Sequence, residues 1–189
     1  PLEDGLVNVS RVAGSATFPA RLMLVAALNP CPCGYFMDAM RSCSCSVSKI
    51  RTYLQRISGP LLDRVDIQIE VPRLAREEML ATTDGEPSAA IRSRVERARE
   101  IQARRFVGTG IFCNAHMRPR DIRKHCPLSE EVRAFLGRAI DQLGLSARAF
   151  DRVVKLSRTI ADLAGDPDIT AAHVAEAIQY RGLDRKLWA

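Results

Sequence analysis

The sequence predicts two parts of different fold class: an α/β part over residues 1–72, followed by an all-α part. Three observations lead to this prediction. Residues 6–18 alternate apolar and polar side chains around a Gly14-Ser15 turn, which is typical of a β-hairpin. Residues 21–28 are nearly all apolar, as in a central strand buried on both faces of a parallel sheet. Beyond about residue 86, apolar residues recur at helical spacing.

Turns set the expected limits of the elements that follow. A cysteine-rich loop fills residues 31–45, and a helix is expected over about 46–57, where Ser58-Gly59-Pro60 ends it. Apolar residues alternate over 65–71, which predicts a second strand that ends at Pro72. Two strands and a hairpin bury little surface by themselves, so this part looks like the back half of a larger α/β domain.

Helix-capping residues recur through the all-α part. Pro87 stands at an early position of the first helix, and Gly165 follows the longest one. The predicted N-caps of the later helices are Ser129, Ser146 and Thr170. This pattern predicts a helical domain after the α/β part.

Composition excludes a membrane protein and a disordered chain. The 189 residues carry a net charge of +6, and 47% of them are apolar. The longest apolar run, 22–28, is far shorter than a membrane span, and no secretory signal opens the sequence. We therefore expect a cytoplasmic protein and, because there is no initial Met, a piece of a longer one. Only four of the 28 basic residues are lysine, which is compatible with phosphate partners and equally with a GC-rich genome.

The lysines also bear on nucleotide binding. A P-loop needs Gly-Lys followed by Ser or Thr, but the four lysines follow Ser48, Arg123, Val154 and Arg185. No Asp-Glu pair follows an apolar strand. We expect that this chain holds neither nucleotide-cradling motif of a P-loop ATPase and does not hydrolyse ATP alone.

Two C-x-C pairs, separated by nine residues, give the strongest local signal. Four thiolates suit a tetrahedral zinc ion or, less often, an iron–sulfur cluster. Reduced thiols without metal and redox disulfides are the alternatives, and the spacing is tighter than the usual C-x-x-C. The candidate ligands are Cys31, Cys33, Cys43 and Cys45.

Three polar residues are candidates for contact with an anion or water, each with an ordinary structural alternative. Asn29 follows a predicted strand, at the edge where α/β sheets bind ligands, but it is also a turn residue before proline. Arg64 could reach into a neighbouring subunit's phosphate site or pair with an adjacent aspartate. Arg148 lies in the first turn of a helix, where a cation opposes the helix dipole, so it either binds an external anion or is solvated.

Three stretches carrying the motifs LVAALNPCPCG, SGPLLDR and LSARAF resemble the ComM/YifB family, bacterial AAA+ ATPases often labelled magnesium-chelatase-like. The resemblance covers almost the whole chain. It implies the back half of an AAA+ P-loop ATPase core over 1–72, a connecting helical segment over 73–112 and a helical lid domain over 113–189. It also implies a ring, expected to be a hexamer, that uses ATP and Mg²⁺.

The resemblance further implies a role for each candidate. Asn29 would be the sensor-1 residue that orients the attacking water, Arg64 the arginine finger that acts on the next subunit's ATP, and Arg148 the sensor-2 residue of the lid. The hairpin resembles the pre-sensor-1 hairpin of MCM-type helicases, in which Arg11 would contact DNA phosphate, with Arg21 behind it.

The function expected from this resemblance is ATP-driven DNA translocation or branch migration. The alternatives are a metal-insertion motor of the magnesium chelatase type and a protein-remodelling motor. A further hypothesis is a zinc-stabilised binding module without enzymatic activity, against which the incomplete sheet argues.

Overall fold

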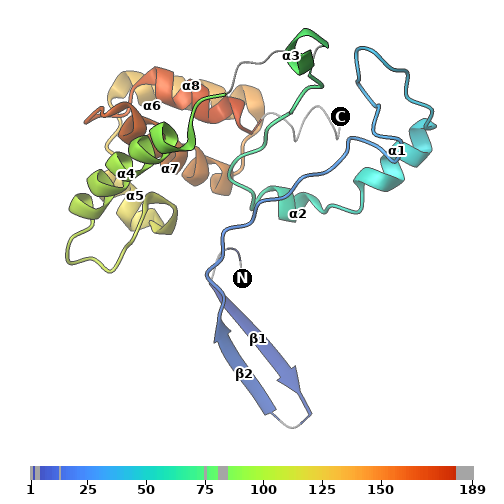
Figure 1. The fold of residues 1–189 in the computed structure, drawn as a ribbon. Coiled ribbons are helices and arrows are strands. Elements are labelled where there is room, and N and C mark those ends of the chain that lie inside the picture. Colours follow the sequence, from blue (N-terminus) through green and yellow to red (C-terminus); the bar gives the residue numbers. More distant parts are fainter. Residues whose placement is uncertain (1, 3–4, 13, 75, 81–84, 182–189) are drawn as a thin grey trace. The chain divides into compact units, whose positions relative to one another are not determined.

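The computed structural model describes residues 2, 5–12, 14–74, 76–80 and 85–181. The chain divides between Val65 and Asp66 into two compact units. The first holds a hairpin, the cysteine-rich loop and two short helices, and the second is helical (Figure 1). In the described part of the chain, no helix is long and apolar enough to cross a membrane.

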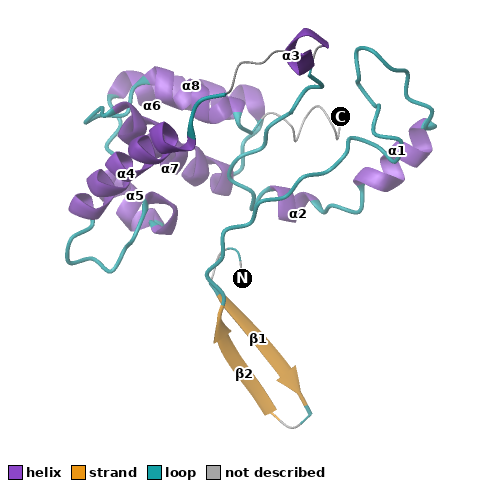
Figure 2. Cartoon of the chain, in the orientation of Figure 1, coloured by secondary structure: helices purple, strands orange, loops and turns teal. Residues whose placement is uncertain are grey.

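The predicted hairpin is confirmed. Strand β1, Leu6–Arg11, pairs antiparallel with β2, Gly14–Pro19, so that Arg11 stands opposite Gly14 at the turn. Thr17 donates a hydrogen bond across the strands to Asn8 (2.7 Å). Almost every residue of both strands is exposed. These are the only strands in the part of the chain that the structure describes (Figure 2).

The two other predicted strands do not form. Residues 20–29, which include the expected sensor-1 strand, have no strand partner, and Met23 and Val25 are 88% and 85% exposed. Residues 65–71, the expected arginine-finger strand, likewise form no strand with any described segment, and Ile69 is 61% exposed. A parallel-sheet strand needs hydrogen-bonding neighbours on its flanks. Because the described residues supply none, both predictions are wrong for this chain.

The helices of the first unit begin at serine caps. Ser46 accepts a hydrogen bond from the backbone N–H of Lys49 (3.3 Å) and starts α1, Val47–Leu54, which confirms the predicted helix with an earlier end. Ser58 caps the short helix α2, Gly59–Leu62, in the same way. The predicted helix breaker at 58–60 therefore also starts a helical turn, because proline is tolerated in the first turn of a helix.

The second unit builds a core of its own. Its elements are α3 (Arg76–Leu80), α4 (Ser88–Arg105), the 3-10 turn η1 (Asn114–His116), α5 (Pro119–His125), α6 (Glu130–Leu143), α7 (Ala147–Ala164) and α8 (Ala171–Gln179). The predicted N-caps all accept backbone N–H groups, and Gly165 ends α7 in the left-handed conformation (φ 82°). The core residues Leu136, Val153 and Val174 come from α6, α7 and α8 and are at most 1% exposed.

Candidate metal centre and nucleotide-contact residues

Four cysteine sulfurs meet in the loop that precedes α1. The Sγ of Cys31 lies 3.3 Å from that of Cys33 and 3.7 Å from that of Cys43, and the Cys33 and Cys43 sulfurs are 3.5 Å apart. With Cys45, all four sulfurs lie within 4.8 Å of one another, and all four thiols are free. A tetrahedral zinc ion with Zn–S bonds of about 2.3 Å places its sulfurs about 3.8 Å apart. The observed spacing therefore fits a four-coordinate metal ion.

The local backbone explains how the two C-x-C pairs converge. Cys31 is fully buried against Ile50 and Leu54 of α1. Gly34 donates its N–H to the Cys31 carbonyl (3.0 Å) with φ +83°, which turns the chain back after the first pair. Cys45 directly precedes the N-cap of α1, so the second pair is fixed by the start of that helix.

The pKa values of two cysteines in the cluster, Cys33 and Cys43, are shifted in opposite directions. The backbone N–H groups of Tyr35 and Ser44 stabilise the anion and lower the pKa of Cys33 to about 5. The N–H of Cys45 acts in the same direction on Cys43, but burial and the neighbouring thiols outweigh it and raise the pKa of Cys43 to about 12. Adjacent thiolates repel one another, whereas a bound dication removes that repulsion and displaces the protons.

Asn29 lies beside this loop. Asn29 is exposed and is the last residue of the extended segment 20–29. A Cβ placed on Gly34 would be 3.9 Å from the Asn29 Cγ, so the Asn29 amide packs beside the turn that follows the first cysteine pair. The sensor-1 candidate and the metal-ligand candidates, which the sequence analysis treated separately, are thus neighbours.

The two candidate nucleotide arginines lie in different units. Arg64 follows α2 and is half-buried, and its Nη1 donates to the Pro60 carbonyl (2.8 Å). Arg148 is exposed in the first turn of α7, where Ser146 accepts the N–H of Ala149 (3.2 Å). Their nucleotide roles remain predictions.

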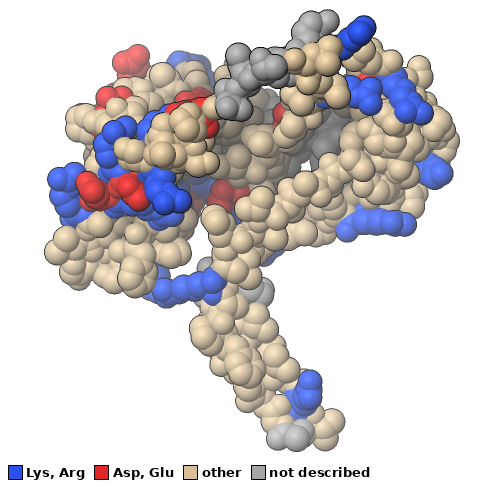
Figure 3. Space-filling model, viewed as in Figure 1, with Lys and Arg blue, Asp and Glu red and all other residues tan. Residues whose placement is uncertain are grey.

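The two candidate DNA contacts lie at opposite ends of the hairpin. Arg11 is exposed beside the turn, and Arg21 lies at the base, where its Cγ would be 3.2 Å from a Cβ on Gly5. The described strands carry one basic residue, Arg11, and no acidic one, and Figure 3 shows blue near the tip of the hairpin and no red along it. The hairpin therefore presents positive charge only.

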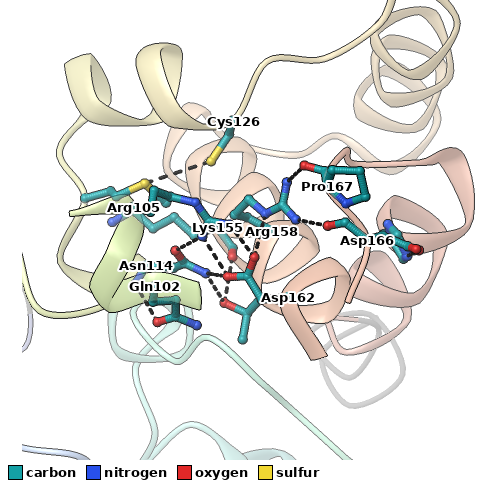
Figure 4. Close-up of polar contacts among 12 residues, drawn as sticks. Gln102, Arg105, Asn114, Cys126, Lys155, Arg158, Asp162, Asp166 and Pro167 are labelled. Atoms are coloured by element: carbon teal, nitrogen blue, oxygen red, sulfur yellow. Dashed lines mark hydrogen bonds and ion pairs between the residues drawn. The ribbon is translucent and has the colours of Figure 1, made fainter. Parts of the chain in front are cut away.

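The second unit also contains a buried polar network that was not predicted from the sequence. The fully buried carboxylate of Asp162 accepts hydrogen bonds from Arg105 (2.7 Å), Arg158 (3.0 Å) and Asn114 (2.8 Å), as Figure 4 shows. Arg158 also donates to two backbone carbonyls beyond the end of α7. The available signal was the Arg158–Asp162 pair at i and i+4 on the apolar face of the predicted helix. The network joins α4, η1 and α7 and is structural in character.

Comparison with known proteins covers both units. Residues 85–181 match the family model described as magnesium chelatase, subunit ChlI C-terminal, and residues 1–79 match the model described as magnesium chelatase, subunit ChlI. Competence protein ComM of Haemophilus influenzae is 44% identical over 188 residues, which are 99% of this chain and 36% of that protein. The uncharacterized protein YifB of Escherichia coli is 40% identical over 189 residues, again 99% and 36%. The resemblance to ComM and YifB is confirmed, and the chain spans about a third of the length of these relatives.

Proposed function

The chain belongs to the magnesium chelatase subunit ChlI C-terminal family, and from that premise we propose that it is the C-terminal part of a ring-forming AAA+ ATPase that moves along DNA. The observation that carries the DNA part is the exposed hairpin with Arg11 beside its turn and no acidic residue on its strands. Such a hairpin can bind DNA phosphates through charge without contacting the bases, so its binding would not depend on DNA sequence. We place this motor in the cytoplasm.

For the nucleotide, we propose that most of the ATP·Mg²⁺ site lies in parts of the longer protein outside this chain. Of the residues here, Asn29 would orient the attacking water. Arg64 would offer positive charge to the next subunit's γ-phosphate, and Arg148 would do so from the lid of the same subunit. The exposure of Asn29 and Arg148 supports these roles, since both side chains are accessible to a ligand. The domain limits at 72 and 112 and the hexameric ring are part of the same proposal.

DNA binding by the full-length protein tests the proposal directly. We expect a labelled forked DNA to bind in the presence of a non-hydrolysable ATP analogue, with log K falling linearly as log salt rises. Arg11→Glu should weaken binding about 10-fold or more and reduce the salt slope. Arg133→Glu, the same charge change at an exposed position of α6, serves as the matched control and should bind as the unchanged protein does. Absence of binding at low salt would contradict the proposal and favour the metal-insertion or protein-remodelling motor, of which the family description supports the first.

For the four-cysteine cluster, which could hold a metal ion, we propose zinc. Four sulfur ligands in tetrahedral array suit Zn²⁺, and the closed ligand set leaves no open position, as in structural sites. Metal analysis of the purified chain should give one zinc per molecule. Cys43→Ser should lose it, whereas Cys126→Ser, which removes a buried thiol outside the cluster, should retain it. Iron with visible absorbance, or no metal at all, would contradict the proposal.

A further inference from the structure

The cysteine cluster joins the two ends of the loop that carries it, because Cys31 and Cys33 lie at the start of the loop and Cys43 and Cys45 at its end. Residues 31–45 are described throughout, and they contain no helix or strand. Two hydrogen bonds join backbone groups within them: Gly34 N–H to the Cys31 carbonyl (3.0 Å) and Asp38 N–H to the Tyr35 carbonyl (3.2 Å). The Asp38 carboxylate accepts the N–H groups of Met40 and Arg41 (2.8 Å each), and Arg41 donates to the Tyr35 hydroxyl (2.8 Å). These side-chain bonds all lie in the middle of the loop and do not join its ends. A cross-link or a metal that joins the ends of such a loop lowers the entropy of the open chain and so favours the ordered form. A metal ion bound by the four sulfurs would therefore hold the two ends of this loop together.

Asn29 is tied to this loop at two points. Along the chain, Pro30, with its fixed φ, is all that separates it from Cys31, the most buried of the four cysteines. In space, its amide packs beside the backbone at Gly34, which directly follows Cys33. Both points thus adjoin the first pair of ligands, while Asn29 itself is exposed and adjoins an extended segment without strand partners.

We propose that the metal-bound cysteine loop positions the Asn29 side chain, so that occupancy of the metal site sets the rate of ATP hydrolysis by the assembled protein but not its affinity for ATP. This inference rests on the proposed function, because Asn29 must contact the attacking water. The cysteines and Gly34 are positioning residues, since they act through Asn29. Groups that orient the groups in contact with substrate typically change activity 10- to 100-fold when lost, and a misplaced water lowers kcat rather than binding.

The test uses the full-length protein and measures zinc content, kcat and KM for ATP together. Cys43→Ser removes one of the two candidate ligands that are distant in sequence from Asn29. We expect it to lose zinc and to lower kcat about 10-fold or more, with KM unchanged. Cys43→His keeps a zinc-binding side chain and should largely restore kcat. Cys113→Ser, outside the cluster, is the matched control for removing a thiol.

A double-mutant cycle with Asn29→Ala tests separately whether Asn29 acts in ATP hydrolysis and whether the cysteine loop positions it. Asn29→Ala alone should lower kcat, and adding it to Cys43→Ser should cost little more, because both changes remove the same contact. If Cys43→Ser loses zinc but keeps its kcat while Asn29→Ala does not, the inference is overturned and the role of Asn29 stands. If Asn29→Ala keeps full kcat, the proposed role of Asn29 fails and the inference fails with it.

A second variant covers the case in which Cys43→Ser does not fold. Gly34→Ala keeps all four ligands but strains the turn beside Asn29, because φ +83° disfavours any side chain with a Cβ. We expect full zinc content with a lower kcat. Full zinc content with unchanged kcat would overturn the inference.

Discussion

The two units of this chain differ in how far they bury their apolar side chains. In the second unit, Leu136 and Val153 are at most 1% exposed, within a core to which α6, α7 and α8 all contribute. In the first, Met23 and Val25 are more than four-fifths exposed, and the buried apolar residues gather around the cysteine cluster. The second unit is therefore held by packing, whereas the first buries apolar side chains only around its four-cysteine cluster and leaves an apolar segment without strand partners among the described residues.

The contrast shows what each unit needs in order to be ordered. A packed helical unit carries its stabilising contacts within its own sequence. A unit whose extended segments lack sheet neighbours relies on local cross-links and short turns. Truncating a single apolar side chain should consequently be costly in the core of the second unit and nearly silent in the exposed segment of the first.

The largest effect should come from the buried charge network of the second unit. Asp162→Ala leaves Arg105, Arg158 and Asn114 without their shared acceptor, which should cost about 3–5 kcal/mol of unfolding free energy. Urea unfolding followed by far-UV circular dichroism measures this cost, because most of the helix lies in the second unit. Asp141→Ala removes an exposed carboxylate of α6 and should change the midpoint very little. Equal midpoints for the two variants would show that the network is not what holds the unit.

The same truncation made in both units sharpens the comparison further. Leu136→Ala should lower stability by about 2–5 kcal/mol, through lost transfer free energy and the cavity left behind. Leu24→Ala, at a position 52% exposed, should change it by less than about 0.5 kcal/mol. Native-state hydrogen exchange read by mass spectrometry reports the opening of each unit separately. A large effect of Leu24→Ala would mean that the extended segment is packed in solution.

This contrast also explains what could be predicted from the sequence. The caps at Ser129, Ser146 and Thr170 were predicted correctly, because a cap depends on residues within one turn of the helix. The strands at 21–28 and 65–71 were predicted from apolar patterning, but a strand also needs partners, and the described chain supplies none. Sequence patterns within a few residues therefore predicted the helix caps correctly but could not predict strands, which depend on distant partners.

The same distinction between local and long-range structure decides which sites could be predicted from the sequence. The two C-x-C pairs identified the cysteine cluster directly, because all four ligands come from one loop. The network around Asp162 escaped notice because its partners Asn114 and Arg105 lie 48 and 57 residues away in the chain. The contact between Asn29 and the turn at Gly34 could not be predicted either, since it depends on the shape that the loop adopts.

A moderate effect is expected from removing a helix cap in the packed unit. Ser129 accepts the N–H of Val132 at the start of α6 (3.3 Å). Ser129→Ala should cost about 1 kcal/mol, while Ser129→Asp should keep the cap and most of the stability. Urea unfolding again supplies the measurement. If the alanine and aspartate variants are equally destabilised, the cap hydrogen bond contributes nothing and the loss lies elsewhere.

The smallest effect concerns the pH dependence of the second unit alone, where all three histidines lie. Burial, followed by the nearby charge of Lys124, lowers the pKa of His125, whose ring also stands edge-on to Phe106 (5.3 Å between centroids). A pKa that is lower in the folded protein than the unfolded value of about 6.5 means that folding favours the neutral ring. This contribution is therefore complete above pH 6.5 and is lost as the pH falls below it. The carboxylate of Glu86, whose pKa Arg94 lowers from 4.5, titrates in a more acidic range. We expect unfolding midpoints to drop slightly between pH 7.5 and 5.5, and His125→Gln to flatten that drop. An equal drop in the variant would place the titrating group elsewhere in the unit.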